Sequence, residues 1–190
     1  MIEIKSPAED PTKSRPHYSI FLAGSIEQDT ADDWQDKVVS AFVRDPVVIY
    51  NPRRADWDAS LTNEITEPVF EHQVMWELKY MNLADTIVMY FQPGTKSPIT
   101  LLELGLHADS NKLVVCCPPG FWRRGNVDII CREYKIEEVE SIDGLVEVVR
   151  RRMAAIDQVR ADMMRYMSDL SPLTNILKRI EKEMRKELDK

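Results

Sequence analysis

The sequence predicts an α/β protein in which short apolar strands alternate with helices. Four runs of strand length are rich in β-branched and aromatic residues, and stretches with apolar residues three and four apart lie between them; the runs are residues 17–23, 46–50, 85–91 and 113–117. The run 46–50 is apolar throughout, as expected for a strand covered on both faces. Ligands of open α/β sheets bind beyond the carboxyl ends of the strands, so we expect a site in the loops there.

The first part of the chain is expected to begin with a polar arm, residues 1–16, before the first strand. Thr30 is placed to cap a helix, because its hydroxyl can accept a bond from the first turn and apolar residues follow at helical spacing up to Val43. A long polar connection, residues 53–67, follows the second strand. Connections of this length between packed elements are commonly binding segments.

Two helices are predicted by a proline at the first turn, where the missing N–H costs nothing. Pro68 opens a helix that runs through Leu83, and Pro98 opens another after the third strand. Beyond the fourth strand, residues 127–131 and 134–136 are expected to add one short strand. The predicted sheet therefore has about five strands.

The remainder, residues 141–190, is expected to be a helical extension of an α/β domain that covers residues 17–140. Apolar residues recur with a period near 3.5 over residues 145–167, and Ser171-Pro172 is expected to end this helix before a second, charged one. Methionines line the apolar stripe. Such a stripe is most simply a packing surface, on its own domain or on a second subunit.

A chain of 190 residues, 44% hydrophobic and 30% charged, is long enough for one α/β domain with a real core plus an appendage. No apolar run approaches the roughly 20 residues of a membrane span. The first residues also lack a signal-peptide core, so we expect a cytoplasmic protein with no membrane partner. The net charge of −7 argues against a nucleic-acid polymer as partner, but not against a single nucleoside.

The motifs of several cofactor-dependent and metal-dependent classes are missing. We find no Walker-type phosphate loop, no dinucleotide-binding glycine pattern, no nucleophile-elbow serine pattern and no Cys-x-x-Cys pair. The cysteines, two of them adjacent at Cys116 and Cys117, are expected to be buried thiols, and the three histidines have no ligand partner at metal spacing. We therefore expect no metal and no cofactor, and catalysis would rest on carboxylates.

One carboxylate, Glu103, lies in an apolar run soon after the turn that precedes Pro98. Leucines flank it on both sides, and buried carboxylates are rare unless they are paired. Glu103 is therefore either a rim residue of a buried helix face or an acid held half-buried in a pocket. A position near a helix start favours the ionised carboxylate through the helix dipole, whereas apolar neighbours oppose ionisation.

Residues 20–134 resemble the nucleoside 2-deoxyribosyltransferase-like family. The resemblance rests on short motifs that are each weak alone and fairly specific in this order. They are Phe21-Leu22-Ala23-Gly24-Ser25-Ile26, Asn51-Pro52-Arg53-Arg54 with Trp57, Phe70-x-x-Gln73-x-x-Trp76-Glu77-Leu78, Ala84-Asp85, Ser97-Pro98 to Glu103-Leu104-Gly105, and Gly120 to Val127. The resemblance implies a doubly wound parallel sheet of the flavodoxin-like kind, which matches the order of strands and helices predicted above.

The resemblance also implies an enzyme that cleaves or transfers the N-glycosidic bond of a nucleoside and releases the free base. In the family the Glu before Leu-Gly is the nucleophile, here Glu103, and an acid on the preceding helix protonates the base, for which Glu77 or Gln73 falls nearest. Retaining glycosidases use the same two steps through a covalent glycosyl ester. The implied site comprises Glu103, Glu77 and Ser97 for catalysis and Phe21, Gly24, Ser25, Glu27, Arg54, Trp57, Gln73 and Asn126 for substrate binding.

Two positions differ from the transferases of the family, and a third differs from the related hydrolases. The first-strand tyrosine is Phe21 here, and the acid six residues before the nucleophile is Ser97, as in the related deoxynucleoside 5′-monophosphate hydrolases. Those hydrolases carry an arginine that helps bind phosphate where this chain has Glu27. A like charge a few ångströms from a phosphate costs on the order of a few kcal/mol, so we expect free deoxynucleosides to be preferred.

Three alternatives remain open at this point. The first is a nucleotide hydrolase of the same fold. The second is a binding or regulatory module that keeps the pocket without turnover, as Phe21 would allow, and the third is a scaffold organised by the C-terminal helices. Family members complete each active site with residues from a neighbouring subunit. The resemblance therefore implies a homo-oligomer, with Asn126 as the candidate donor.

Overall fold

The structure is a computed structural model. It describes residues 1–11, 18–26, 32–54 and 60–188, with the side chains of residue 169 and of residues 171–188 outside that description. The chain divides into two compact units, residues 1–149 and residues 150–190. None of the described helices is both long and apolar enough to cross a membrane.

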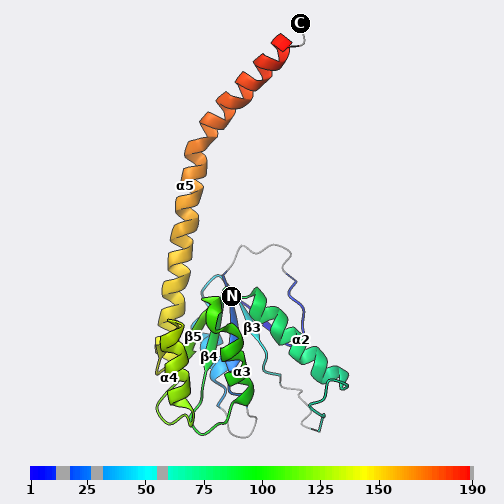
Figure 1. Cartoon of the computed structure of the whole chain (residues 1–190), viewed down its shortest axis with the longest axis vertical. Coiled ribbons are helices and arrows are strands. Elements are labelled where there is room, and N and C mark those ends of the chain that lie inside the picture. The colour runs from blue at the N-terminus through cyan, green and yellow to red at the C-terminus, as the bar shows by residue number, and fades with distance from the viewer. Residues whose placement is uncertain (12–17, 27–31, 55–59, 189–190) are drawn as a thin grey trace. The chain divides into compact units, whose positions relative to one another are not determined.

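Six strands of the described residues form one parallel sheet in the order β1-β3-β2-β4-β5-β6. Figure 1 labels three of them, β3, β4 and β5. Their bounds are β1 Ile2–Lys5, β2 Tyr18–Gly24, β3 Val47–Asn51, β4 Thr86–Tyr90, β5 Leu113–Cys116 and β6 Glu137–Val139. Counted from β2, the order is 2-1-3-4-5, which is that of flavodoxin-like doubly wound sheets. The predicted fold class is confirmed, with β1 as an additional strand at the edge.

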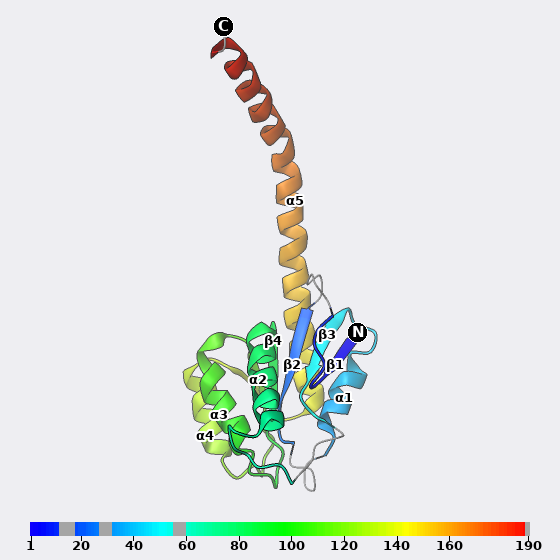
Figure 2. The same cartoon turned by 90° about the vertical axis from the view of Figure 1, so that its right-hand side faces the viewer.

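The five α-helices of the described residues are α1 Trp34–Ala41, α2 Pro68–Leu83, α3 Pro98–His107, α4 Arg124–Glu133 and α5 Ile142–Leu188. Figure 2 shows α2, α3 and α4 on one face of the sheet, and α1 with the start of α5 on the other. Both helices that were predicted from an initial proline begin at that proline. A turn of 3-10 helix, Ala108–Ser110, follows α3.

The largest hydrophobic cluster lies between the sheet and the layer of α2, α3 and α4. Strand β2 contributes Phe21 and Ala23 to this cluster, and α2 contributes Trp76 and Tyr80. Because side chains alternate along a strand, the neighbouring Leu22 points to the opposite face, and it is fully buried there. Apolar cover on both faces is what a parallel sheet requires, and it accounts for the apolar character of the strand runs.

The N-terminal residues, predicted as a polar arm, belong in part to the sheet. Residues 2–5 form β1, which pairs in parallel with β3. Farther along, Ala8 accepts a hydrogen bond through its carbonyl from Trp76 Nε1 at 2.8 Å, and the Asp10 carboxylate accepts one from the Tyr50 hydroxyl at 2.8 Å. An edge strand has only one neighbour and needs few apolar side chains, so the polar composition of this segment concealed it.

Two local predictions in the α/β unit are wrong. Residues 127–131 lie in helix α4 and not in a strand, because Val127 and Cys131 are its buried residues at a spacing of four. A short apolar run alone does not distinguish the two structures. The cap of α1 is Asp33, whose carboxylate accepts a bond from the Asp36 amide at 3.0 Å, whereas Thr30 lies outside the described residues.

The predicted break at Ser171-Pro172 is also absent, since α5 continues through both residues to Leu188. A proline inside a helix removes one backbone bond, and a long helix with many remaining bonds can retain it. Cys116, Cys117 and Cys131 are free and buried, as expected of structural thiols.

Candidate active site

The site is organised around the point where β2 and β4 lie side by side. The chain leaves β2 toward β3 and leaves β4 toward β5, so the connections diverge and open the crevice in which doubly wound sheets bind ligands. Gly24 ends β2 with φ +146°, and a Cβ on it would lie 2.5 Å from the carbonyl oxygen of Tyr90 and 2.8 Å from Trp34 Cζ2. Glycine is therefore required where the two strands end.

Three buried hydroxyl groups join the loops that follow these strands. Ser25 Oγ lies 2.6 Å from Ser97 Oγ and 3.0 Å from Thr95 Oγ1, and the last two oxygens are 2.8 Å apart. Ser25 Oγ also accepts a bond from the Gln92 amide at 3.0 Å. These contacts hold the end of β2 against the start of α3.

Ser97 occupies the cap position of α3, but its side chain makes no capping hydrogen bond. Its hydroxyl turns instead into the cluster with Ser25 and Thr95. The backbone of Ser97 has φ +46°, which is uncommon for a residue other than glycine and is often found at functional sites. The conformation turns the chain sharply before Pro98 and sets the direction in which α3 begins.

Glu103 lies in the second turn of α3 and is 9% exposed. No hydrogen bond to its carboxylate is found among the described residues, so little compensates for the loss of hydration. Burial raises the pKa of Glu103 to about 8, and the nearby negative charge of Glu77 acts in the same direction. The opposing influence of the apolar neighbours therefore exceeds that of the helix dipole.

Glu77 lies on α2 and is half-buried. Burial raises its pKa, and a hydrogen bond from Gln73 partly offsets the increase. Gln73 Nε2 donates to Glu77 Oε1 at 2.8 Å and to the carbonyl of Pro52 at 3.1 Å, while Gln73 Oε1 accepts from Ser6 Oγ at 2.5 Å. Both the nitrogen and the oxygen of the Gln73 side-chain amide are thus hydrogen-bonded to protein atoms, and the bond from the nitrogen positions the Glu77 carboxylate.

Phe21 is 1% exposed and packs against Trp76, with ring centroids 6.2 Å apart. It lies on the face of the sheet that α2 and α3 cover, within the hydrophobic cluster. At this position it contributes apolar packing and no hydroxyl group.

The other positions named from the sequence are more dispersed. Arg54 follows β3 and is half-buried, and Asn126 lies exposed in the first turn of α4. Glu27 and Trp57 lie outside the described residues. The structure thus gathers Gly24, Ser25 and Ser97 in one loop cluster and Gln73, Glu77 and Glu103 in one group of side chains between α2 and α3.

Sequence reasoning missed three contributors. Thr95 lies two residues before Ser97 in the same loop, which was a usable signal. Gln92, 9% exposed, accepts a bond from the Asp32 amide at 2.8 Å through its side chain. Ser6 reaches Gln73 only because β1 joins the sheet, and nothing in the sequence near Ser6 indicates that contact.

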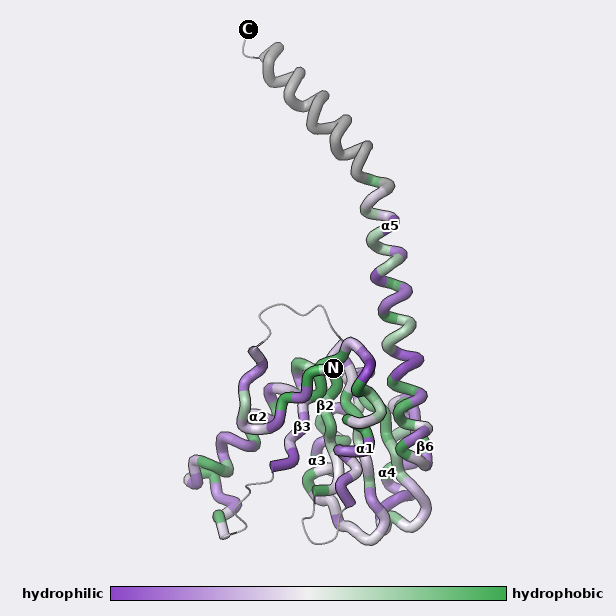
Figure 3. Tube along the Cα trace, turned by 180° about the vertical axis from the view of Figure 1, so that it is seen from behind, coloured by the Kyte–Doolittle hydropathy of each residue, from purple (hydrophilic) through white to green (hydrophobic). Residues whose placement is uncertain are grey.

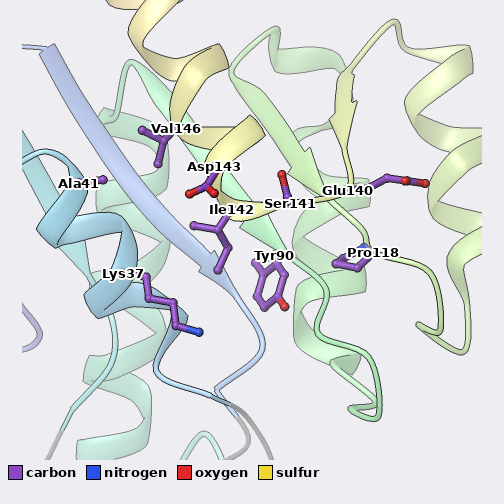
Figure 4. Close-up of a pocket in the computed structure, with 9 residues that line it drawn as sticks. All are labelled: Lys37, Ala41, Tyr90, Pro118, Glu140, Ser141, Ile142, Asp143 and Val146. Atoms are coloured by element: carbon purple, nitrogen blue, oxygen red, sulfur yellow. The ribbon is translucent and has the colours of Figure 1, made fainter.

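A separate hollow is found at the same edge of the sheet, on the face covered by α1 and the start of α5 (Figure 4). It is lined by Lys37, Ala41, Tyr90, Pro118, Glu140, Ser141, Ile142, Asp143 and Val146. The Tyr90 ring packs against Trp34 there, with centroids 5.4 Å apart. This hollow does not contain the two acids, because the sheet lies between it and α3.

Two carboxyl groups with raised pKa values can hold one proton between them, so that one acts as a base or nucleophile and the other as an acid. This combination suits the cleavage of a bond to a leaving group that needs protonation. Among the described residues, no three histidine, cysteine, aspartate or glutamate side chains are grouped so as to bind a metal ion.

Fold and site together define a flavodoxin-like α/β protein with an acid pair close to its topological switch point. The family described as "Nucleoside 2-deoxyribosyltransferase like" matches residues 17–121, and the chain belongs to this family. Membership indicates the general kind of function, glycosyl transfer involving small-molecule nucleosides.

A crystal structure of a conserved protein from Enterococcus faecalis V583 is similar in fold, with a TM-score of 0.53 and 15% sequence identity. The similarity covers 72% of this chain and 99% of that one. No curated protein matches the sequence significantly.

Proposed function

We propose that the protein cleaves or transfers the N-glycosidic bond of free deoxynucleosides, with Glu103 as the nucleophile and Glu77 as the acid. The observation that carries this proposal is the pairing of a buried carboxyl group, Glu103, with a half-buried one, Glu77, at the positions where the family motifs lie. A buried acid pair is costly to maintain in a fold, and such pairs are concentrated at functional sites.

In the first step a Glu103 carboxylate oxygen attacks the anomeric carbon of the sugar and forms a glycosyl ester. The bond from that carbon to the base nitrogen breaks, and the electron pair goes to the base. Glu77 supplies the proton that neutralises the departing base, which leaves Glu77 ionised. In the second step a nitrogen of another base, or water, opens the ester and returns its own proton to Glu77.

This cycle needs the pair to carry a single negative charge before the substrate reacts. The active form has Glu103 ionised and Glu77 protonated. The pKa values of both groups are raised, so the two carboxyl groups compete for one proton, and the active form is one of the two ways in which the pair can hold it. The hydrogen bond from Gln73 keeps one Glu77 oxygen occupied, so the other is left to face the substrate. Phe21 is 1% exposed within the hydrophobic cluster, so it would support the site by packing and donate no bond to the substrate.

The direct test is to incubate the purified protein with a panel of deoxynucleosides and free bases and to separate the products by chromatography. Glu103→Gln keeps the volume of the side chain and removes its nucleophilic charge, so turnover should be lost while the melting temperature is retained or raised. Glu71→Gln is the matched control, because Glu71 is an exposed acid of α2. Full activity of Glu103→Gln would end the covalent mechanism.

The same panel decides between substrate classes. Deoxycytidine and deoxyadenosine should be cleaved in preference to their 5′-monophosphates, since Glu27 stands where the related hydrolases carry an arginine. Cleavage of the monophosphates alone would instead favour the nucleotide hydrolase, which the serine at position 97 resembles. Binding of nucleosides without any cleavage would favour the non-catalytic module.

We also infer that a second copy of the chain approaches the site. Helix α3 exposes Ile99, Leu102 and Leu106, at 60%, 67% and 59%, on the surface away from the sheet. Apolar patches of this kind are typical of interfaces. Asn126 at the start of α4 is exposed as well, which agrees with a role toward a neighbouring subunit.

A further inference from the structure

Helix α5 carries an uninterrupted heptad repeat in the unit formed by residues 150–190. With Ile156 assigned to position a, every a and d position up to Met184 is occupied by an apolar or aromatic residue. The a positions are Ile156, Met163, Leu170, Leu177 and Met184, and the d positions are Val159, Tyr166, Leu173 and Ile180. The repeat covers four heptads, which is the length at which such a pattern indicates a coiled coil.

The period of the pattern identifies the kind of partner. A strict seven-residue repeat corresponds to 3.5 residues per turn, and it keeps an apolar seam in contact with another helix only when the two helices supercoil. A helix that packed on a globular surface would instead follow a period near 3.6. The a and d residues of α5, here called its seam, therefore fit a helix with the same repeat.

Three large side chains of the seam are exposed. Val159, Met163 and Tyr166 are 61%, 62% and 64% exposed. Figure 3 shows apolar and polar residues alternating along this stretch of α5. Three large apolar or aromatic side chains exposed on one stripe would favour aggregation of an isolated chain.

We propose that α5 forms a parallel, in-register coiled coil with α5 of a second copy over residues 156–184. This proposal is independent of the proposed catalytic function and goes beyond it. At 1.5 Å per residue the contact would extend over about 43 Å.

Charge at the flanking positions does not oppose pairing between identical helices. In a parallel pair each g residue faces the e residue five positions later in the partner. These pairs are Ala155 with Arg160, Asp162 with Met167, Asp169 with Thr174, Ile176 with Glu181, and Glu183 with Leu188. None of them opposes like charges, and the seam itself contains no charged residue, so self-association meets no electrostatic penalty.

Pro172, which the sequence suggested as a helix end, falls at position c of this repeat. Position c lies on the outer surface of a two-stranded coil. The proline therefore leaves the seam intact, and the apolar pattern continues on both sides of it at Leu170 and Leu173.

Cysteine cross-linking in the full chain tests both the contact and its direction. Val159→Cys places a thiol at a d position, where a parallel, in-register pair brings it opposite its own copy. Ala161→Cys is the matched control, because Ala161 is exposed at the outward-facing f position. The native cysteines are buried and provide a low background. On mild oxidation we expect a disulfide-linked dimer from Val159→Cys in at least tenfold greater yield than from Ala161→Cys.

A second pair of variants tests the seam by charge. Met163→Lys with Leu170→Lys puts two charges in the seam, whereas Ala161→Lys with Ser168→Lys adds the same charge at f positions. The two substitutions in the seam, here called the seam pair, should abolish cross-linking of Val159→Cys and lower the mass measured by light scattering twofold or more. The two substitutions at f positions should change neither the cross-linking nor the mass. Equal cross-linking at positions 159 and 161, no cross-linking at 159, or a mass unaffected by the seam pair would overturn the proposal.

Discussion

At the scale of single residues, the properties of Glu103 follow from what surrounds it. A carboxyl group with a folded-state pKa of about 8 and an ordinary value of 4.5 keeps its proton longer in the folded protein than in the unfolded chain. The free energy of unfolding therefore falls as the pH rises from about 4.5 to about 8, by an amount on the order of a few kcal/mol. The fold tolerates this cost at Glu103, and strongly shifted pKa values are concentrated at functional sites.

The pH dependence of the reaction follows from the same raised pKa, but it has the opposite sign to that of the stability. Glu103 must be ionised to attack, so kcat/KM should rise with pH toward about 8. It should fall again at higher pH, where Glu77 loses the proton that the departing base needs. Glu77→Gln removes the negative charge that raises the pKa of Glu103, and the rising limb should move to lower pH. The maximal rate should fall roughly 10²-fold to 10⁴-fold, because the acid is also lost.

The measurement is a pH profile of kcat/KM for wild type, Glu77→Gln and the exposed control Glu71→Gln. An unchanged rising limb in Glu77→Gln would show that Glu77 does not act on Glu103. A limb displaced to higher pH would contradict the proposed pairing of the two acids outright.

The sequence predicted the surroundings of the candidate site residues unevenly, and the reasons differ from residue to residue. Glu103 was identifiable because an acid among leucines is unusual, and Glu77 because it lies in a motif on a helix. The contacts of Gln73 with Ser6 and Pro52 were not predictable, since they depend on where an edge strand and a distant loop end. The burial that raises the pKa of Glu103 is likewise a property of the packed helices.

At the scale of the elements, predictions succeeded where one physical signal was strong. Proline at a first turn located α2 and α3, and β-branched runs located β2, β3, β4 and β5. The predictions failed where the sequence pattern was weak, or where the same pattern fits both a helix and a strand. The apolar run at residues 127–131 fits a helix as well as a strand, and β1 carries only two apolar residues, Ile2 and Ile4.

Two glycines should respond to alanine with opposite signs. Gly24→Ala would force a Cβ against Tyr90 and Trp34 at a positive φ, and it should destabilise the protein by on the order of 3 kcal/mol. Gly105→Ala has open space in the interior of α3 and should stabilise it by about 0.5–1 kcal/mol. Urea denaturation of both variants measures the difference, and a neutral Gly24→Ala would mean that the ends of β2 and β4 can separate freely.

At the scale of the whole molecule, two surfaces are suited to contact a second copy. The seam of α5 contains a heptad repeat, and the exposed stripe of α3, residues 99, 102 and 106, lies near the acid pair. The two surfaces lie in different compact units, so each can be altered without changing the other. Association through α5 can therefore be tested separately from association through α3.

The stripe of α3 is best examined in the background of Met163→Lys with Leu170→Lys, where α5 should no longer associate. Leu102→Lys replaces a leucine that is 67% exposed, so it should not unfold the chain, but it should convert a dimer into a monomer by light scattering. Val43→Lys is the matched control, because Val43 is 61% exposed and follows α1 on the opposite face of the sheet.

If Asn126 of a neighbouring subunit completes the site, Leu102→Lys should also lower turnover tenfold or more. Asn126→Ala should lower turnover without changing the mass. If the chain that carries only Met163→Lys and Leu170→Lys is a monomer with full activity, then each chain contains a complete site.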